Sequence, residues 1–182
     1  MAGLKHLQMQ REQKDLSFRY NILWLMVNNN IMDNQGKYEE KIVQINRVSK
    51  KTKGGNKVRF AALVVVGDKK GKVGVGLGKS ADVASAIIKA VAYAKNRLID
   101  VPIVNETIPH KIQIKEGAAV VMLKPAPQGA GLIAGGAVRS VVEAAGIRNI
   151  SSKILGSSNK ASNVYATFEA LKQLGKQNGG VK

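Results

Sequence analysis

The segment that most constrains the fold is a β-hairpin pattern followed directly by an amphipathic helix. Val58–Val66 is rich in valine and is bounded by turn-forming residues, which is typical of a strand. The turn Gly67–Gly71 leads into a return strand over Lys72–Leu77, and Gly71 can adopt the positive φ that a hairpin turn needs. Apolar residues at three- and four-residue spacing then predict a helix over Ala81–Leu98, with an apolar face formed by Val83, Ile87, Val91, Ala94 and Leu98.

A further strand precedes this hairpin. Lys41–Lys50 mixes apolar and polar residues, with Val43, Ile45 and Val48 available for one side. The basic, glycine-containing segment Lys51–Lys57 then predicts a loop that joins this strand to the next one. We therefore expect a three-stranded antiparallel sheet with one helix behind it.

A second unit is expected after Val101–Pro109, a candidate linker with two prolines. Its patterns predict three strands and two helices, in the order His110–Lys115, Ala118–Leu123, helix Ala137–Ala145, Ile147–Leu155 and helix Lys160–Leu174. Lys124–Gly131 is expected to be a stiff, exposed loop, Gly146 to end the first helix, and Gly156–Asn159 to cap the second. This order of elements predicts a compact α+β unit.

Charge is the strongest signal about function. The 182 residues include 29 Lys and Arg but 12 Asp and Glu, a net charge of +17, and a compact domain with this charge repels itself unless a polyanion is bound. Nucleic acid is the usual polyanion, because phosphate neutralisation releases counterions. Residues 41–100 hold 14 basic and 3 acidic residues, against 10 and 4 in residues 101–182, so the first unit is the better candidate for an RNA-binding surface.

Other classes of protein fit the sequence less well. A basic soluble protein without a polyanionic partner is the plain alternative. A membrane-surface protein would need a long basic amphipathic helix or a lipidation signal, and neither is evident. The apolar run Ile22–Val27 has six residues, whereas a membrane-spanning helix needs about 20. Cysteine is absent, which fits a cytoplasmic protein and rules out disulfides and thiol catalysis.

Gly74–Ser80 ends in Gly-Lys-Ser and invites comparison with a phosphate-binding P-loop. The P-loop requires four residues between its two glycines, and Val73 stands where the first glycine should be. We expect instead that the small residues let strand and helix approach closely, and that Lys79 lies at a helix start that favours a phosphate of RNA. His6 and His110 have no acidic neighbour in sequence, so we expect neither an enzyme nor a metal or other cofactor.

Two glycine-containing regions are candidates for contacts with partners. Lys50, Lys51 and Lys53 beside Gly54-Gly55 form a cationic segment that can press against a phosphate strand, with an ordinary solvated turn as the alternative. Gly129–Gly131 and Gly135-Gly136 permit close approach of RNA, of a neighbouring protein or of the chain's own sheet. Arg139 and Arg148 are either clamps for phosphate or carboxylate, or solvated residues at the ends of elements.

Several of these motifs together resemble bacterial small-subunit ribosomal protein five. They occur in order along the chain from about Glu39 to Leu174, as Asn46–Lys50, Lys53–Gly55, Val64–Asp68, Gly71–Lys79 and Gly131–Arg139. The resemblance implies an N-terminal domain like the double-stranded-RNA-binding fold over residues 39–103. It also implies a C-terminal α+β domain of the left-handed βαβ type over residues 104–176, with a tail at 177–182. Residues 1–38 would be a poorly ordered extension.

The same resemblance implies a structural protein bound to 16S ribosomal RNA in the cytoplasmic 30S subunit. It would neighbour ribosomal proteins four and eight, support the arrangement of head and body, influence decoding accuracy and line the channel through which messenger RNA enters. Residues 50–56 would lie near the spectinomycin site, and residues 131–139 toward protein four. No membrane association and no homo-oligomer are expected. A free RNA-binding regulator and an NTP-dependent enzyme are the rival functions.

We expect phosphate contacts and a protein interface at named positions. The RNA-binding residues would be Arg47, Lys50, Lys51, Lys53, Gly54, Gly55, Lys57, Arg59, Lys72 and Lys79. The side facing protein four would contain Gly131, Gly135, Gly136 and Arg139. Asn56 departs from the basic residue or glutamine usual in the family, and Lys57 can supply the charge instead. Residues 1–31 have no counterpart in the family, and we hypothesise that Met32 is the natural start.

Overall fold

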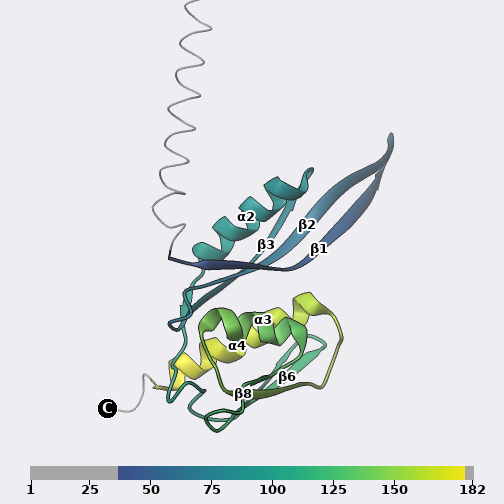
Figure 1. The fold of residues 1–182 in the computed structure, drawn as a ribbon. Coiled ribbons are helices and arrows are strands. Elements are labelled where there is room, and N and C mark those ends of the chain that lie inside the picture. The colour runs from purple at the N-terminus through teal and green to yellow at the C-terminus, as the bar shows by residue number, and fades with distance from the viewer. Residues whose placement is uncertain (1–36, 179–182) are drawn as a thin grey trace, which may run out of the picture. The chain divides into compact units, whose positions relative to one another are not determined.

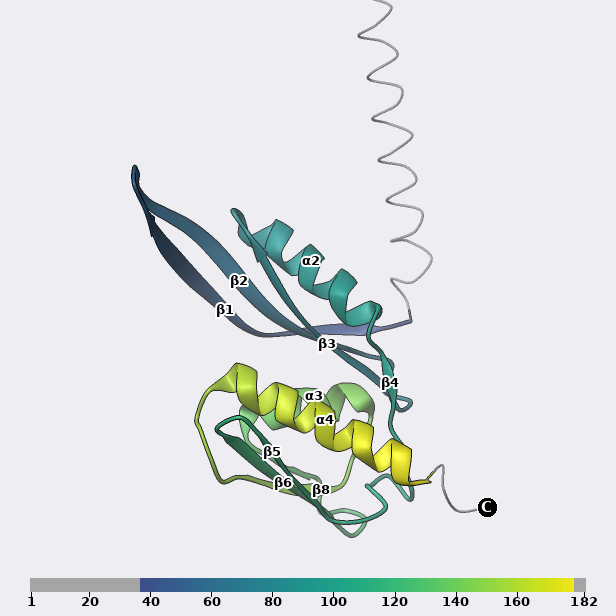
Figure 2. The same ribbon diagram turned by 180° about the vertical axis from the view of Figure 1, so that it is seen from behind.

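The computed structural model describes residues 37–178, which form two four-stranded sheets and three helices (Figures 1 and 2). This confirms the predicted α+β class. The expectations for the N-terminal extension and for Met32 lie outside the described residues, as do those for the last four residues of the chain.

The first sheet has the antiparallel order β1-β2-β3-β4. Its strands are β1 (Glu39–Thr52), β2 (Gly55–Gly67), β3 (Lys72–Ser80) and β4 (Ile99–Asp100). The three predicted strands are present, and the short β4 adds a fourth beside β3. The predicted loop over Lys51–Lys57 is wrong, because the ladder continues to the pair Thr52↔Gly55. Gly55 has φ +125°, which lets the chain reverse over Lys53 and Gly54 alone.

Helix α2 (Val83–Lys95) lies unusually close to β3. A Cβ atom built on Gly76 would stand 2.0 Å from the carbonyl oxygen of Ala90, and one built on Gly78 would stand 2.2 Å from that of Ala86. This confirms the expected role of the small residues. The predicted apolar face of the helix is confirmed in part, since Ala94 is buried and Ile87 and Val91 are half-buried against the same cluster. The prediction missed Ala86 and Ala90, which are the fully buried residues at the centre of the contact. A helix backbone this near a strand leaves no room for larger side chains at the contact.

The opposite face of the first sheet packs on helices α3 (Gly136–Ala145) and α4 (Lys160–Asn178). Successive residues of β2 point to opposite faces of the sheet. Leu63 and Val65 belong to the core that includes α3 and α4, whereas Val64 and Val66 pack against α2. The resulting order of layers is α2, first sheet, α3 with α4, and second sheet. Burial on both faces explains why the middle of β2 is a continuous apolar run.

The turn between β2 and β3 caps the C-terminus of α3. The Lys69 amide donates to the carbonyl oxygen of Ala144 at 3.1 Å, and the Gly71 amide donates to that of Ala145 at 2.9 Å. These carbonyls would otherwise lack partners, as the last carbonyls of any helix do. Gly146 ends the helix in the left-handed region at φ +90°, as predicted, and a Cβ atom there would stand 2.1 Å from the Lys69 carbonyl oxygen.

The second sheet is mixed, with the order β5-β6-β8-β7. Its strands are β5 (Ile112–Glu116), β6 (Ala119–Pro125), β7 (Leu132–Ile133) and β8 (Ile150–Ile154). Strand β7 was not predicted from the sequence. It pairs in parallel with β8, and α3 connects the two strands, so that the three elements form a βαβ unit. The predicted cap of α4 is confirmed, because the Ala161 amide donates to Asn159 Oδ1 at 3.1 Å.

Candidate nucleic-acid interface

The β1–β2 hairpin extends beyond the rest of its sheet. The last pair between β2 and β3 is Phe60↔Ser80, so that five further residues of β2 pair only with β1 (Figure 1). At the tip, Thr52 Oγ1 donates to the Gly55 carbonyl oxygen at 2.8 Å. Cβ atoms built on Gly54 and Gly55 would meet no atom within 4 Å, so the backbone of the tip is open to a ligand.

Exposed cations cover this hairpin. They are Arg47, Lys50, Lys51, Lys53, Lys57 and Arg59. The register places Lys50 directly opposite Lys57, with Arg59 on the same face, while Arg47 and Lys51 point to the other face. Asn56 lies opposite Lys51, and so avoids the second like-charge pair that a basic residue there would create.

No acidic residue lies between Lys41 and Gly67 in the sequence. Within residues 37–178, none of the six hairpin cations forms an ion pair. A pair of lysines directly across two strands destabilises a hairpin by mutual repulsion. The sequence therefore carries a local electrostatic cost here, which a bound anion would reduce.

The ion pairs of the first sheet gather at its other end. Lys41 Nζ lies 2.6 Å from Glu143 of α3, and this hydrogen bond lowers the pKa of the Glu143 carboxyl from its ordinary value. Lys69 pairs with Glu39 at 2.5 Å, a hydrogen bond that raises the pKa of the Lys69 ammonium. The acids thus neutralise cations near α3 and leave those of the projecting hairpin available.

The two remaining predicted phosphate contacts lie on β3, apart from the hairpin tip. Lys72 is exposed and lies 3.8 Å from Asp100 of β4. Lys79 is also exposed, but the prediction that it stands at a helix start is wrong, because β3 continues through it to Ser80. The first amides of α2 are not free for a phosphate either, since Asp82 accepts hydrogen bonds from the amides of Ala84 and Ser85.

Replacing Asp82 by alanine removes this cap and leaves both amides without their side-chain acceptor. We expect a loss of about 1 kcal/mol in the free energy of unfolding. Urea unfolding followed by circular dichroism measures it. Asp82→Asn, which keeps an acceptor oxygen, is the matched control and should recover most of the loss. Equal losses in the two variants would show that the effect comes from the carboxylate charge at the helix N-terminus and not from the capping hydrogen bonds.

The predicted protein-facing residues come together around β7 and the start of α3. Gly131 has φ +71°, and its amide donates to Asn149 Oδ1 at 3.1 Å. A Cβ atom on Gly135 would stand 2.9 Å from Ile154 Cδ1, so this glycine also serves the chain's own packing. Gly136 faces open space, and the exposed Arg139 donates to the Leu132 carbonyl oxygen at 3.3 Å. Arg148, the other candidate clamp, pairs with Glu106 at 2.8 Å.

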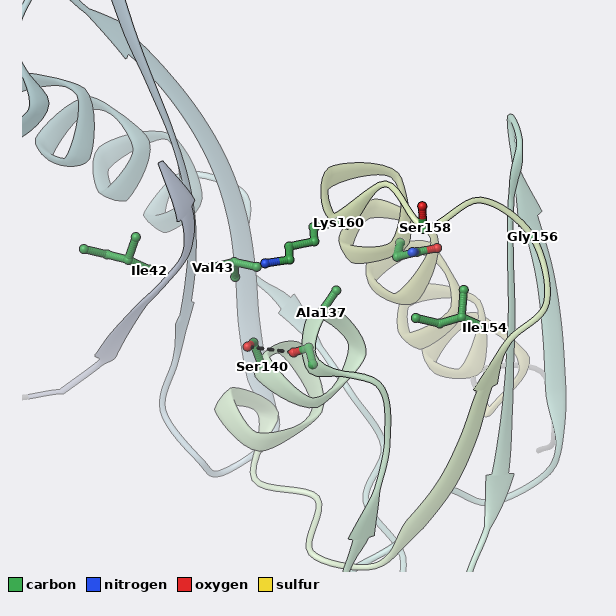
Figure 3. Close-up of a pocket in the computed structure, with 10 residues that line it drawn as sticks. Ile42, Val43, Ala137, Ser140, Ile154, Gly156, Ser158 and Lys160 are labelled. Carbon is green, nitrogen blue, oxygen red and sulfur yellow. Dashed lines mark hydrogen bonds between the residues drawn. The ribbon is translucent and has the colours of Figure 1, made fainter. Parts of the chain in front are cut away.

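A pocket of about 590 Å³ lies between β1, α3 and the start of α4 (Figure 3). Val43, Ala137 and Ile154 form apolar parts of its wall, and Lys160 extends toward Val43. Its Ser140 hydroxyl donates to the Gly136 carbonyl oxygen at 3.0 Å. No carboxylate or imidazole lines this pocket, and Lys160 is the ionisable side chain among its lining residues.

The described His, Asp and Glu residues form no group of three that could hold a metal ion. None of the helices in residues 37–178 combines the length and the apolar character that crossing a bilayer requires.

Two family models match the chain. Residues 38–102 match "Ribosomal protein S5, N-terminal domain", and residues 114–178 match "Ribosomal protein S5, C-terminal domain". The first match covers the sheet that carries the cationic hairpin, and the second covers nearly all of the sheet with α3 and α4.

Proposed function

Since this chain belongs to the ribosomal protein S5 family, we propose that it binds 16S ribosomal RNA within the 30S subunit and that the β1–β2 hairpin is its principal RNA contact. The family is a structural, non-enzymatic class of the small ribosomal subunit whose members associate with ribosomal RNA and other ribosomal proteins. The proposal concerns which RNA is bound and by which residues.

The observation that carries the proposal is the like-charge pair Lys50↔Lys57 at the end of a two-stranded extension without acids. A two-stranded ribbon has little apolar burial to stabilise it. Phosphates on both faces of the ribbon would neutralise Lys50 and Lys57 on one side and Arg47 and Lys51 on the other. The open glycine tip then allows the RNA backbone to approach the protein backbone directly.

Recognition by shape suits this surface better than recognition of sequence. Lysine ammonium groups act as point charges toward phosphates and carry little base-specific geometry. The wide minor groove of A-form RNA exposes phosphates and 2′-hydroxyls to such a ribbon. The hairpin would therefore fix the position of a helix or junction in the subunit.

We further propose that residues 131–139 face ribosomal protein four. The support is an exposed Arg139, an open Gly136 and a βαβ unit that holds both. The same proposal includes contact with ribosomal protein eight and a position beside the channel through which messenger RNA enters. It also includes an effect on decoding accuracy and on the arrangement of head and body, and a cytoplasmic location. They rest on family membership.

Sucrose-gradient sedimentation of a lysate, with the chain followed by mass spectrometry, tests the proposed function. The chain should track the 30S and 70S peaks in constant stoichiometry and remain there after a wash with moderate salt. A chain that stays at the top of the gradient would instead be a free RNA-binding regulator that uses the same hairpin. The same spectra show whether residues 1–31 are present in the native protein.

A further inference from the structure

The second sheet has one covered face and one open face. Helices α3 and α4 cover the face that carries Val121 and Leu123 of β6, and both of these residues are fully buried. Because side chains alternate along a strand, Val120, Met122 and Lys124 point to the opposite face. No element in residues 37–178 packs over that side of β6.

The strand register identifies the neighbours of these residues on the open face. Gln113 of β5 lies opposite Met122, which lies opposite Lys153 of β8. Lys115 pairs with Val120, and Lys124 pairs with Ser151. Lys111 immediately precedes β5, at the end of the strand where Lys124 lies. Four lysines therefore share this surface, which we name the outer lysine face: Lys111, Lys115, Lys124 and Lys153.

The outer lysine face is exposed and has no acid of its own. All four lysines are exposed, and none forms an ion pair within the described residues. Glu116 is the only acidic residue of strands β5–β8. It points to the same face of β5 as Ile112 and Ile114, which is the face that the helices cover. The uncharged residues between the lysines are Gln113, Val120, Met122 and Ser151.

This composition fits a phosphate backbone better than a protein. Lysine is depleted from protein–protein interfaces, whereas it is an ordinary ligand for phosphate. Lys124 and Lys153 are diagonal neighbours on adjacent strands, a relation that places Cα atoms about 7–8 Å apart. Long lysine stems can cover the half-buried Val120 and Met122 while their ammonium groups reach outward. The strongly apolar exposed residues, Ile133 and Leu155, lie at the margin of the face.

We propose that the outer lysine face is a second RNA-binding surface, which binds the phosphate backbone of ribosomal RNA independently of the hairpin. It lies on the opposite side of the α3–α4 layer from the first sheet, so the two surfaces would hold separate RNA segments. The inference rests on the proposed function, because it takes ribosomal RNA as the polyanion.

The test compares the full-length chain with the variant Lys115→Gln/Lys124→Gln/Lys153→Gln. Filter binding to a full-length 16S ribosomal RNA transcript is measured across a series of KCl concentrations. The plot of log K against log salt has a negative slope, and each lost phosphate contact makes it less steep by about 0.9. The magnitude of the slope should therefore decrease by about 2 to 3 in this variant. Affinity near 0.15 M salt should fall at least about tenfold.

A matched control removes the same charge from other exposed positions. Lys70→Gln/Lys89→Gln/Lys160→Gln lowers the net charge equally and touches neither RNA surface, and it should bind almost as tightly as the parent chain. Thermal unfolding of all variants checks that the folds are intact. Photo-crosslinking of assembled small subunits provides an independent measurement, in which peptides containing Lys115, Lys124 or Lys153 should carry nucleotide adducts.

The outcomes separate this inference from the proposed function. Parent-like binding by the outer-face variant, together with weak binding by a hairpin variant, overturns the second surface and leaves the proposed function intact. Crosslinks from the outer lysine face to an acidic protein in place of RNA also overturn the second surface. If neither variant changes binding to the RNA, the proposed function itself fails.

Discussion

Replacing Gly76 by alanine should destabilise the protein by about 3 kcal/mol or more. The added Cβ atom would stand 2.0 Å from the Ala90 carbonyl oxygen and 2.9 Å from the Ala94 amide nitrogen, both backbone atoms of α2. A flexible side chain could move aside, but a helix backbone can only shift as a whole. The shift would break the contact of Ala86, Ala90 and Ala94 with the sheet, which is the overpacking that costs most in a dense core.

Equilibrium urea unfolding measures this effect, and Gly136→Ala is its control. Gly136 is the first residue of α3, has no positive φ, and an added Cβ atom there meets nothing within 4 Å. Alanine at that position should be neutral or stabilising, because it reduces the freedom of the unfolded chain. A loss below about 1 kcal/mol in Gly76→Ala would show that strand and helix are not in the close contact described.

Neutralising the hairpin as Lys50→Gln/Lys51→Gln/Lys57→Gln should weaken binding to 16S ribosomal RNA by about a hundredfold near 0.15 M salt. The negative slope of log K against log salt should become less steep by about 2 to 3, in line with three lost phosphate contacts. The expected change in folding has the opposite sign. Removal of the Lys50↔Lys57 repulsion should leave stability unchanged or raise it by a few tenths of a kcal/mol.

Filter binding and urea unfolding on the same preparation measure both effects. The equal-charge variant Lys70→Gln/Lys89→Gln/Lys160→Gln distinguishes local contacts from the general loss of positive charge. Weaker binding accompanied by a lower unfolding midpoint would indicate a structural role for these lysines. Equal loss of affinity in the two variants would mean that the hairpin is no special contact.

The sequence predicted the elements whose cause is local. The valine-rich β2, the turn at Gly71 and the end of α3 at Gly146 follow from neighbouring residues alone. The projecting ribbon could not be predicted, because Lys51–Lys57 has the composition of a loop and becomes a strand pair through the conformation of Gly55. The two-residue β7 has no pattern of its own and exists because β8 lies beside it.

The part of the candidate site that depends on neighbouring residues could be predicted from the sequence, whereas the part that depends on strand pairing could not. Clustered charges in sequence predicted the hairpin lysines as phosphate contacts, and the structure places these lysines exposed on one projecting ribbon. In the outer lysine face, three strands carry one lysine each and Lys111 precedes the first of these strands, so only the register of the sheet brings the four together. Alternation along β6 is a visible signal, but it does not tell which face the helices cover. Likewise, Lys79 was misplaced because the return strand was predicted to end at Leu77, whereas β3 continues to Ser80.

The capping of α3 by the turn between β2 and β3 bears on how this chain could be dissected. A fragment that ended near residue 102 would keep the whole first sheet but expose Leu63, Val65, Val73 and Val75 to water. The complementary fragment would lose the amides of Lys69 and Gly71 that complete its helix. The boundary between the two family matches is therefore a poor place to cut, and a split protein would need to be produced as two co-expressed halves.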